Sequence, residues 1–295
     1  MYVSQLTNYQ SKSKLANHQT VYRYTPNNIC FNDNVSRLSY VTDIFTHLFL
    51  CSSRGGGLES RIDKSIKAKW VIWPGGKIVP LAYEGRKILR SHRNPKYVTV
   101  IFTAGIPDLS EKINDYNHHY TETLYTEAPE TTLDRISHLI SQAIYILTPA
   151  TTDIIFSTIA PIDLETWNLS QLRKKKTNHL LHQHEYDFMN LNLKQAIISM
   201  NNFIKSINTS NKKITPYLDS AVQKYYRNGN YRYFLGRLHD GVHGGEGVKV
   251  IWGRLLNKCI KKNMTNFDFD QRDQENSDED DGSQKRSWKD EKNPN

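Results

Sequence analysis

Short runs of apolar, β-branched and aromatic residues alternate with helical stretches from Thr42 onwards, and this alternation constrains the fold more than any other feature. Nearly continuous apolar runs of strand length are typical of parallel strands that are buried on both faces. Strands that alternate with helices predict a parallel sheet covered by helices. We therefore expect an α/β domain, folded as a three-layer α/β/α sandwich with a mostly parallel, five-stranded sheet.

The individual elements follow from the same pattern. The predicted strands lie near residues 44–50, 70–73, 97–103, 153–159 and 215–218. The predicted helices lie near residues 58–69, 81–91, 132–147, 191–207 and 247–261. The polar segments that remain, 115–130 and 163–188, are predicted to be connections or insertions.

The two ends of the chain differ from its middle in composition. Residues 1–40 are polar without a clear period, which predicts an irregular N-terminal extension before an α/β domain at residues 41–265. Residues 266–295 hold ten acidic and five basic side chains and almost no aliphatic ones, which predicts a disordered acidic tail. Since the whole chain carries +9, residues 1–265 carry +14. A strongly basic body suits a protein that meets polyanions, although the charge also serves solubility.

Several classes of protein are excluded by what the sequence lacks. No run approaches the roughly 18 apolar residues of a membrane span, and no signal peptide is recognisable. The three cysteines are widely spaced, which predicts neither a disulfide framework nor a zinc site and favours an intracellular location, cytoplasmic or nuclear. One histidine cluster consists of His179, His182 and His184. It has no carboxylate or cysteine partner at a recognised spacing, so it predicts no metal site. We also expect no cofactor.

The segment Leu238–Gly245 carries the strongest chemical signal. It places Asp240 three residues before His243 in a glycine-rich turn, just ahead of the last predicted helix. A carboxylate can accept from one ring nitrogen of a histidine and leave the other free to take a proton. The spacing alone is a weak signal, because an Asp-capped turn has the same pattern. It gains weight from a serine-bearing loop that follows the first predicted strand.

Three short segments follow predicted strands, and a fourth precedes the last predicted helix. In chain order they are Cys51-Ser52-Ser53, Pro74-Gly75-Gly76, Gly105-Ile106-Pro107-Asp108 and Asp240-Gly241-Val242-His243. Over residues 42–262 this order resembles the SGNH/GDSL hydrolase superfamily. The resemblance implies Ser53 as nucleophile, His243 as base and Asp240 as its orienting carboxylate. It also implies an oxyanion hole from Gly75 or Gly76 and from Gly105. Ser52 is the alternative nucleophile if the register differs by one residue.

Two departures from the family pattern bear on activity. Ser52 stands where the family has Asp, and Pro107 stands where it has Asn. Proline has neither a side-chain donor nor a backbone N–H, so one oxyanion contact is lost. Such a loss typically costs about 10²–10³ in rate. The resemblance thus implies an ester hydrolase of small ester or acylated substrates, impaired in rate, or a non-catalytic relative. A lectin-like relative that binds carbohydrate or acyl groups is a third reading.

Basic residues suggest the main alternative, a non-catalytic module that binds nucleic acid or a protein partner. Residues 224–234 interleave lysine and arginine with tyrosine and phenylalanine, a pattern that suits single-stranded nucleic acid. Tyrosines packed on the sheet would produce the same pattern. The candidate contacts in this segment and in the basic run at 173–176 are Arg173, Lys174, Lys175, Lys176, Lys224, Arg227 and Arg232. The sequence predicts no particular oligomeric state.

Overall fold

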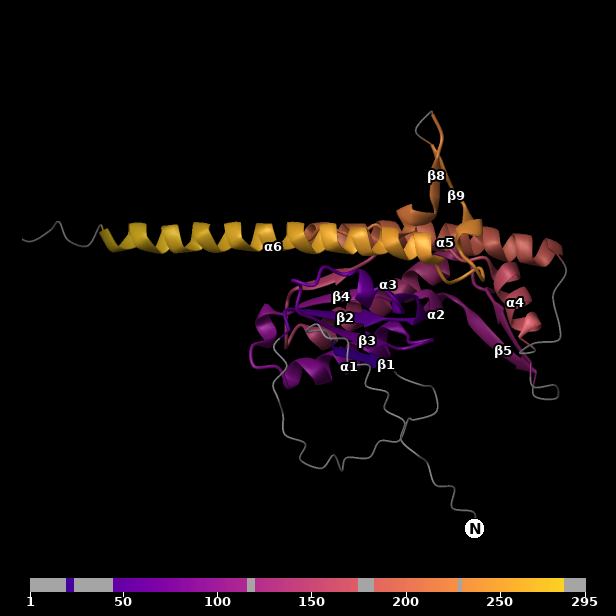
Figure 1. Cartoon of the computed structure of the whole chain (residues 1–295), viewed down its shortest axis with the longest axis horizontal. Coiled ribbons are helices and arrows are strands. Elements are labelled where there is room, and N and C mark those ends of the chain that lie inside the picture. Colours follow the sequence, from indigo (N-terminus) through magenta and orange to yellow (C-terminus); the bar gives the residue numbers. More distant parts are fainter. Residues whose placement is uncertain (1–19, 24–44, 116–119, 175–182, 228–229, 284–295) are drawn as a thin grey trace, which may run out of the picture.

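A computed structural model of the 295-residue chain describes residues 20–23, 45–115, 120–174, 183–227 and 230–283. Its main sheet has five strands in the order β1-β3-β2-β4-β7, and every pair in it is parallel. The strands are β1 (Thr20–Arg23), β2 (His47–Cys51), β3 (Ala68–Ile72), β4 (Thr99–Thr103) and β7 (Ile154–Phe156). The predicted fold class, a three-layer α/β/α sandwich with a mostly parallel sheet, is confirmed (Figure 1).

Helices cover both faces of this sheet because its strands are apolar on both sides. Leu48 and Leu50 of β2 join the core beneath α1 (Ile78–Arg90), α3 (Pro129–Leu147) and α5 (Gln183–Ser210). Phe49 and Cys51 point the opposite way, into the core beneath α6 (Glu246–Ser283). Two shorter helices, α2 (Ile106–Leu109) and α4 (Leu164–Arg173), complete the α-helices of the described residues. Burial on both faces therefore explains the continuous apolar runs.

The strand order places a topological switch point at β2. Strand β2 lies between β3 and β4, so the chain leaves its carboxyl end toward one side of the sheet and later returns on the other. In open parallel sheets, such a point at the carboxyl ends of the strands is where ligands bind. The loop after β2, which begins at Ser52, lies at this point.

Two predicted elements are wrong. Residues 58–69 form no α-helix: they contain the short 3₁₀ turn η2 (Glu59–Arg61) and the first two residues of β3, and Asp63 between them competes with a helix. Its carboxylate accepts the Ser65 N–H at 3.1 Å, and its own N–H donates to Asn257 on α6 at 2.9 Å. Residues 215–218 form no strand: Pro216 lacks an N–H, and its carbonyl accepts the N–H groups of Thr158, after β7, and of Leu218, each at 3.0 Å. The fifth strand is β1 instead.

Two small hairpins and two helices occupy segments that were predicted otherwise. The segment 115–130 contains β6 (Tyr120–Leu124), which pairs with β5 (Glu111–Asp115). A second antiparallel pair joins β8 (Gln223–Tyr225) to β9 (Tyr231–Tyr233). The predicted connection at 163–188 holds α4 and the start of α5. Helix α4 begins at Leu164 and is capped by Asp163, whose carboxylate accepts the Thr166 N–H at 3.1 Å; a sequence pattern shows such a cap only weakly.

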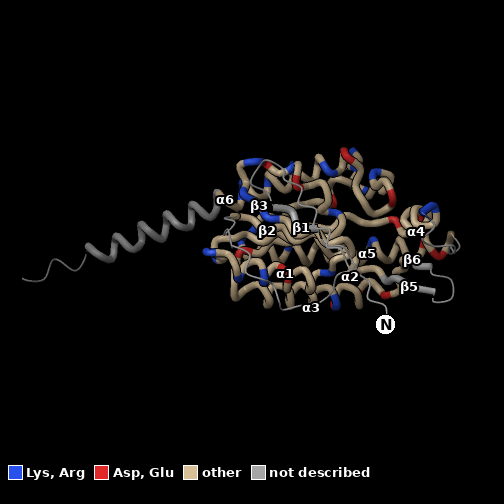
Figure 2. Tube along the Cα trace, turned by 60° about the horizontal axis from the view of Figure 1, so that its bottom comes forward, with Lys and Arg blue, Asp and Glu red and all other residues tan. Residues whose placement is uncertain are grey.

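The terminal segments are described in part. Strand β1 lies within the N-terminal extension that the sequence predicts to be irregular. Helix α6 continues to Ser283 and so includes part of the predicted disordered tail, while 284–295 lie outside the described residues and the disorder stays a prediction. No helix in the described part of the chain is both long and apolar enough to cross a membrane. Basic and acidic residues are interspersed over the side of the domain that Figure 2 shows.

Candidate active site

The serine loop follows directly from β2. Strand β2 ends at Cys51, Ser52 donates its N–H to the Thr103 carbonyl of β4 at 3.3 Å, and the 3₁₀ turn η1 (Ser53–Gly55) begins at Ser53. Ser52 is buried, whereas Ser53 is half-buried. The two neighbouring serines therefore differ in exposure to solvent, and Ser53 is the more accessible of the two.

Gly55 sets how tightly this loop turns. A Cβ atom on Gly55 would lie 2.3 Å from Cys51 Cβ and 2.8 Å from Cys51 Sγ, so the loop packs back against the strand that it has just left. Burial raises the pKa of the Cys51 thiol to about 12, which makes this cysteine a packing residue. Cys51 and Cys259, the cysteines in the described part of the chain, are buried free thiols.

Asp240 and His243 form a closed hydrogen-bonded turn. Asp240 Oδ1 accepts the N–H groups of Val242 and His243 at 3.1 and 2.7 Å. Asp240 Oδ2 lies 2.8 Å from His243 Nδ1. Because an ionised carboxylate only accepts, Nδ1 carries the proton in the neutral ring and Nε2 is left as the basic nitrogen. Nε2 has no hydrogen-bond partner among the residues that the structure describes.

The turn rests on the start of α4. Gly241 has a φ of +80°, which favours glycine, and a Cβ there would lie 2.4 Å from the Asp163 carbonyl oxygen. The Asp163 N–H in turn donates to the Gly241 carbonyl at 2.9 Å. Trp167 of α4 packs beside the imidazole of His243, with 5.7 Å between ring centroids. Helix α4 thus supports both the backbone and the ring of the Asp240–His243 turn.

The environment of Asp240 keeps its carboxylate charged. Burial alone would raise its pKa, but the hydrogen bonds from the His243 ring and from the backbone of His243 and Val242 outweigh burial and hold the pKa well below its ordinary value. A second histidine, the largely exposed His239, places its Nε2 at 3.7 Å from Asp240 Oδ2. The carboxylate is therefore ready to orient an imidazole and to stabilise an imidazolium.

Arg54 joins the serine loop to this turn, and the sequence analysis missed it. Its guanidinium is buried and donates from Nε to the Val242 carbonyl at 2.9 Å. Its two terminal nitrogens donate to the carbonyls of Ala160 and Pro161, after β7, at 2.5 and 3.2 Å. Burial lowers the pKa of Arg54 to about 9, and the nearby Asp240 acts in the opposite direction. An arginine directly after a candidate nucleophile was the only signal available in the sequence.

The two glycines after β3 differ in whether their backbone N–H is already hydrogen-bonded. Gly76 donates its N–H to the Trp73 carbonyl at 2.7 Å, so this donor closes a turn. Gly75 has a φ of +74°, and within the described residues its N–H has no hydrogen-bond partner, as is also the case for Ser53. The structure therefore leaves Gly75, rather than Gly76, with a free N–H donor in the loop after β3.

The segment after β4, Gly105-Ile106-Pro107-Asp108, contacts both the chain after β7 and the start of α1. Gly105 is buried with a φ of +128°, and a Cβ there would lie 2.4 Å from Ile159 Cδ1. Asp108 Oδ2 accepts the Ile78 N–H at the start of α1, at 3.0 Å. Burial raises the pKa of the Asp108 carboxyl to about 6. Pro107 lies in the first turn of α2, where proline is well accommodated but supplies no donor.

Other candidates from the sequence lie elsewhere. Arg173 and Lys174 end α4, while Lys175, Lys176, His179 and His182 lie outside the described residues. Lys224 and Arg232 lie in the β8–β9 hairpin and Arg227 just after β8. Among the described residues, no group of histidine, cysteine and carboxylate side chains is arranged to hold a metal ion.

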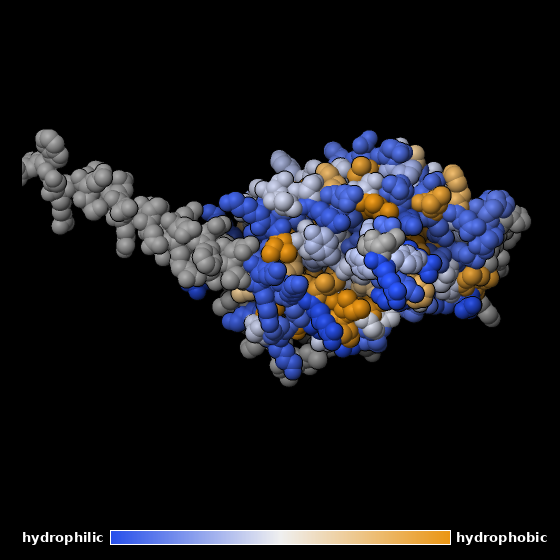
Figure 3. Space-filling view, turned by 90° about the horizontal axis from the view of Figure 1, so that it is seen from above, coloured by the Kyte–Doolittle hydropathy of each residue, from blue (hydrophilic) through white to orange (hydrophobic). Residues whose placement is uncertain are grey.

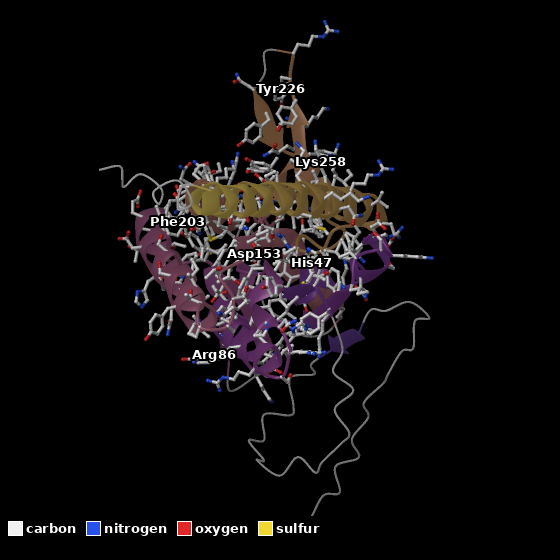
Figure 4. The ribbon with its side chains drawn as sticks, turned by 90° about the vertical axis from the view of Figure 1, so that its left-hand side faces the viewer. His47, Arg86, Asp153, Phe203, Tyr226 and Lys258 are labelled. Carbon is white, nitrogen blue, oxygen red and sulfur yellow. The ribbon has the colours of Figure 1, made fainter. Side chains whose placement is uncertain are left out.

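Two buried features near the sheet are separate from the turn. A cavity beneath the serine loop is lined by Ser52, Thr103 and Trp252 among others, and it shares Arg54 with the site but contains neither Ser53 nor His243. His47, labelled in Figure 4, begins β2 and so lies at the amino end of this strand, whereas Ser53 follows its carboxyl end. Burial lowers its pKa to about 4, so it stays neutral in the core.

The structure does not join all three candidate catalytic residues by hydrogen bonds. Asp240 is bonded to His243, but the Ser53 hydroxyl has no partner among the described residues. Catalytic hydrogen bonds are often long before a substrate binds, so this arrangement does not remove Ser53 as a candidate. The link that is present runs through the backbone, from Ser53 to Arg54 and across to Val242.

No protein-family model matches the sequence, and no curated protein matches it either. Solved structures do resemble the fold. A GDSL-like lipase from Bacteroides thetaiotaomicron is 14% identical, with 73% of this chain and 87% of that chain covered and a TM-score of 0.47. A member of the lipolytic G-D-S-L family from Veillonella parvula is 11% identical, with 73% and 97% covered and a TM-score of 0.41.

An acetyl-xylooligosaccharide esterase mutant from Geobacillus stearothermophilus is 15% identical, with 74% of this chain and 93% of that chain covered and a TM-score of 0.38. These similar structures are thus lipolytic proteins and esterases. At such identities and TM-scores, the likeness carries neither an activity nor a substrate over to this chain.

Proposed function

We propose that this chain is a divergent member of the SGNH/GDSL hydrolase superfamily that acts as a slow serine esterase. The observation that carries the proposal is the Asp240–His243 pair, in which the carboxylate holds Nδ1 at 2.8 Å and leaves Nε2 without a partner among the described residues. This arrangement is what a general base for a serine requires. Arg54 ties the pair to the loop that carries the half-buried Ser53.

The reaction follows from these roles. Ser53 Oγ attacks the carbonyl carbon of an ester while His243 Nε2 takes its proton, and the carbonyl oxygen becomes an oxyanion. In this proposal the free N–H groups of Ser53 and Gly75 donate to this oxyanion, and the backbone of Gly105 is a further candidate donor. Collapse of the intermediate expels the alcohol, which receives the proton from Nε2. Water, activated by the same nitrogen, then releases the acyl group from Ser53.

The departures in the motif explain why we expect a slow enzyme. Pro107 replaces a side-chain donor, and the Gly76 N–H is occupied by Trp73. Each missing oxyanion donor costs about 3–4 kcal/mol of transition-state stabilisation. The residues support a small ester or acylated substrate as a class. The intracellular location stays a prediction of the sequence.

Labelling with a fluorophosphonate tests the proposal, because this probe reacts with a serine only when a base activates it. We expect the purified wild-type chain to be labelled, and Ser53→Ala and His243→Ala each to abolish labelling. Ser52→Ala is the matched control, since Ser52 is buried and should not react. A folded wild-type protein that is not labelled would overturn the esterase and leave a non-catalytic relative. Labelling that survives Ser53→Ala but not Ser52→Ala would move the nucleophile by one residue.

A further inference from the structure

The β8–β9 hairpin rises from the body of the protein on the side of α6 that faces away from the sheet (Figures 1 and 4). Its register pairs Gln223 with Tyr233, Lys224 with Arg232, and Tyr225 with Tyr231. Residues 223–234 contain no acidic side chain. The hairpin is thus a protruding ribbon of basic and aromatic residues, and the proposed esterase does not use it.

The two faces of this ribbon carry different chemistry. Since partners across an antiparallel pair lie on the same face, Tyr225 and Tyr231 share one face and Lys224 and Arg232 share the other. The Tyr225 and Tyr231 rings lie 5.6 Å apart, and the two residues are 62% and 43% exposed. Arg232 lies over the ring of Tyr226 at 5.6 Å. The ribbon therefore has an open aromatic face backed by cations.

The base of the hairpin is held in place by hydrogen bonds to the chain just before it. Asp219 Oδ2 accepts hydrogen bonds from Gln223 Nε2 at 3.1 Å and from the Tyr233 hydroxyl at 3.3 Å. The Phe234 N–H donates to the Val222 carbonyl at 2.6 Å. Large aromatic side chains that are left exposed on an anchored ribbon are typical of a binding surface.

The outer face of α6 continues the positive charge. Arg254, Lys258 and Lys262 are exposed and recur every four residues, so they form one stripe along the helix. None of the three forms an ion pair with a residue that the structure describes. Figure 4 shows Lys258 on the side of α6 on which the hairpin with Tyr226 rises. Figure 3, which looks down on this side, shows mostly hydrophilic side chains.

We propose that the β8–β9 hairpin and the outer face of α6 together bind single-stranded nucleic acid, independently of the esterase site. Unpaired bases can stack on the Tyr225–Tyr231 face, while the phosphates meet Lys224, Arg232 and the α6 stripe. The cations alone would suit any polyanion, but the exposed tyrosine pair selects one with flat aromatic groups. An acidic polysaccharide lacks such groups, and in a duplex the base faces are covered.

Fluorescence anisotropy with a labelled oligothymidylate of about 16 nucleotides tests the proposal. We expect saturable binding by the full chain, which weakens with salt between about 50 and 200 mM. Tyr225→Ala with Tyr231→Ala should weaken binding by at least about fivefold, because each stacked base contributes on the order of 1–3 kcal/mol. Tyr83→Ala with Tyr145→Ala, two exposed tyrosines on α1 and α3, is the matched control and should bind like the wild type.

Charge variants and competitors complete the test. Arg254→Gln with Lys258→Gln should reduce the salt slope by about 1.4, since each phosphate contact on a single strand contributes about 0.7. Ser53→Ala should leave binding unchanged, which separates this proposal from the esterase. Absence of binding overturns the proposal. It is also overturned if the tyrosine variant binds like the wild type, or if heparin or a duplex binds as tightly as the single strand.

Discussion

Arg54 Nε donates a hydrogen bond of 2.9 Å to the carbonyl oxygen of Val242, which joins the residue after the candidate nucleophile to the residue before the candidate base. The two residues are 188 positions apart in the chain. The same guanidinium binds the chain after β7 through Ala160 and Pro161. One buried side chain thus fixes the relative position of three loops at the carboxyl edge of the sheet.

Replacing Arg54 should therefore damage both stability and activity. Arg54→Met leaves three buried carbonyls without their donors, and we expect a loss of about 2–4 kcal/mol in the free energy of unfolding. Arg54→Lys keeps one charged donor, so its free energy of unfolding should lie between those of the wild type and of Arg54→Met. Urea unfolding measures the loss, and Arg90→Met, at the exposed end of α1, is the control. An Arg54→Met protein as stable as the control would refute this role.

Asp240→Asn should impair the base without removing it. The amide can donate to Nδ1, so the neutral imidazole would carry its proton on Nε2 and lose its basic nitrogen. In serine hydrolases this change lowers kcat by up to about 10⁴. The rate of fluorophosphonate labelling measures it, with His239→Ala as the control because the ring of His239 is farther from the carboxylate, at 3.7 Å. Equal labelling of Asp240→Asn and wild type would contradict the assignment of Asp240.

Pro107→Asn should increase the rate of ester turnover. The substitution supplies the side-chain donor that the family pattern has at this position, and one oxyanion donor typically changes the rate by about 10²–10³. We expect a gain toward this size with an activated ester as substrate. Pro107→Ala is the control, because it restores the backbone N–H without a side-chain donor. A gain that is the same for both variants would show that the side chain is not responsible.

Asp108→Asn should alter how stability depends on pH. The pKa of Asp108 is raised to about 6 in the folded protein, so the folded state holds this proton where the unfolded state, with a pKa of about 3.9, has lost it. The contribution of Asp108 to stability is therefore fully present below about pH 4 and is lost as the pH rises to about 6. Asp108→Asn removes this loss, so we expect its advantage over the wild type to grow across that window, by on the order of 1–3 kcal/mol.

Urea midpoints measured from acid to neutral pH test the Asp108 prediction. The Asn side chain can still accept the Ile78 N–H, so the start of α1 should be preserved. Asp134→Asn, on the exposed side of α3, is the control and should run parallel to the wild type. Parallel curves for Asp108→Asn and wild type would show that this carboxyl titrates as in the unfolded chain.

Gly55→Ala should destabilise the serine loop. The new Cβ would meet Cys51 Cβ, an atom fixed to the central strand, at 2.3 Å, and overpacking of this kind costs about 1–3 kcal/mol. Gly247→Ala is the matched control, since a Cβ in the first turn of α6 meets nothing within 4 Å and should be neutral or slightly stabilising. A thermal unfolding midpoint for Gly55→Ala at or above that of Gly247→Ala would contradict the close packing of this turn.

The layered α/β architecture can be predicted from the sequence, because strands buried on both faces must be apolar throughout and their runs stand out between amphipathic helices. The Asp240–His243 turn can be predicted too, since its hydrogen bonds join residues at most three positions apart. Such local geometry is encoded by spacing and by the glycine at 241, whose φ is +80°.

The way in which these parts contact one another depends on long-range contacts. Arg54 reaches Val242, Ala160 and Pro161 across the fold, and no local pattern encodes contacts over such separations. Residues 58–69 do not form the predicted helix, because Asp63 contacts α6 instead. The fifth strand is β1 beside β3 rather than residues 215–218. Contacts between residues distant in the chain stabilise one of several locally acceptable conformations in each of these segments. These conformations position the candidate site.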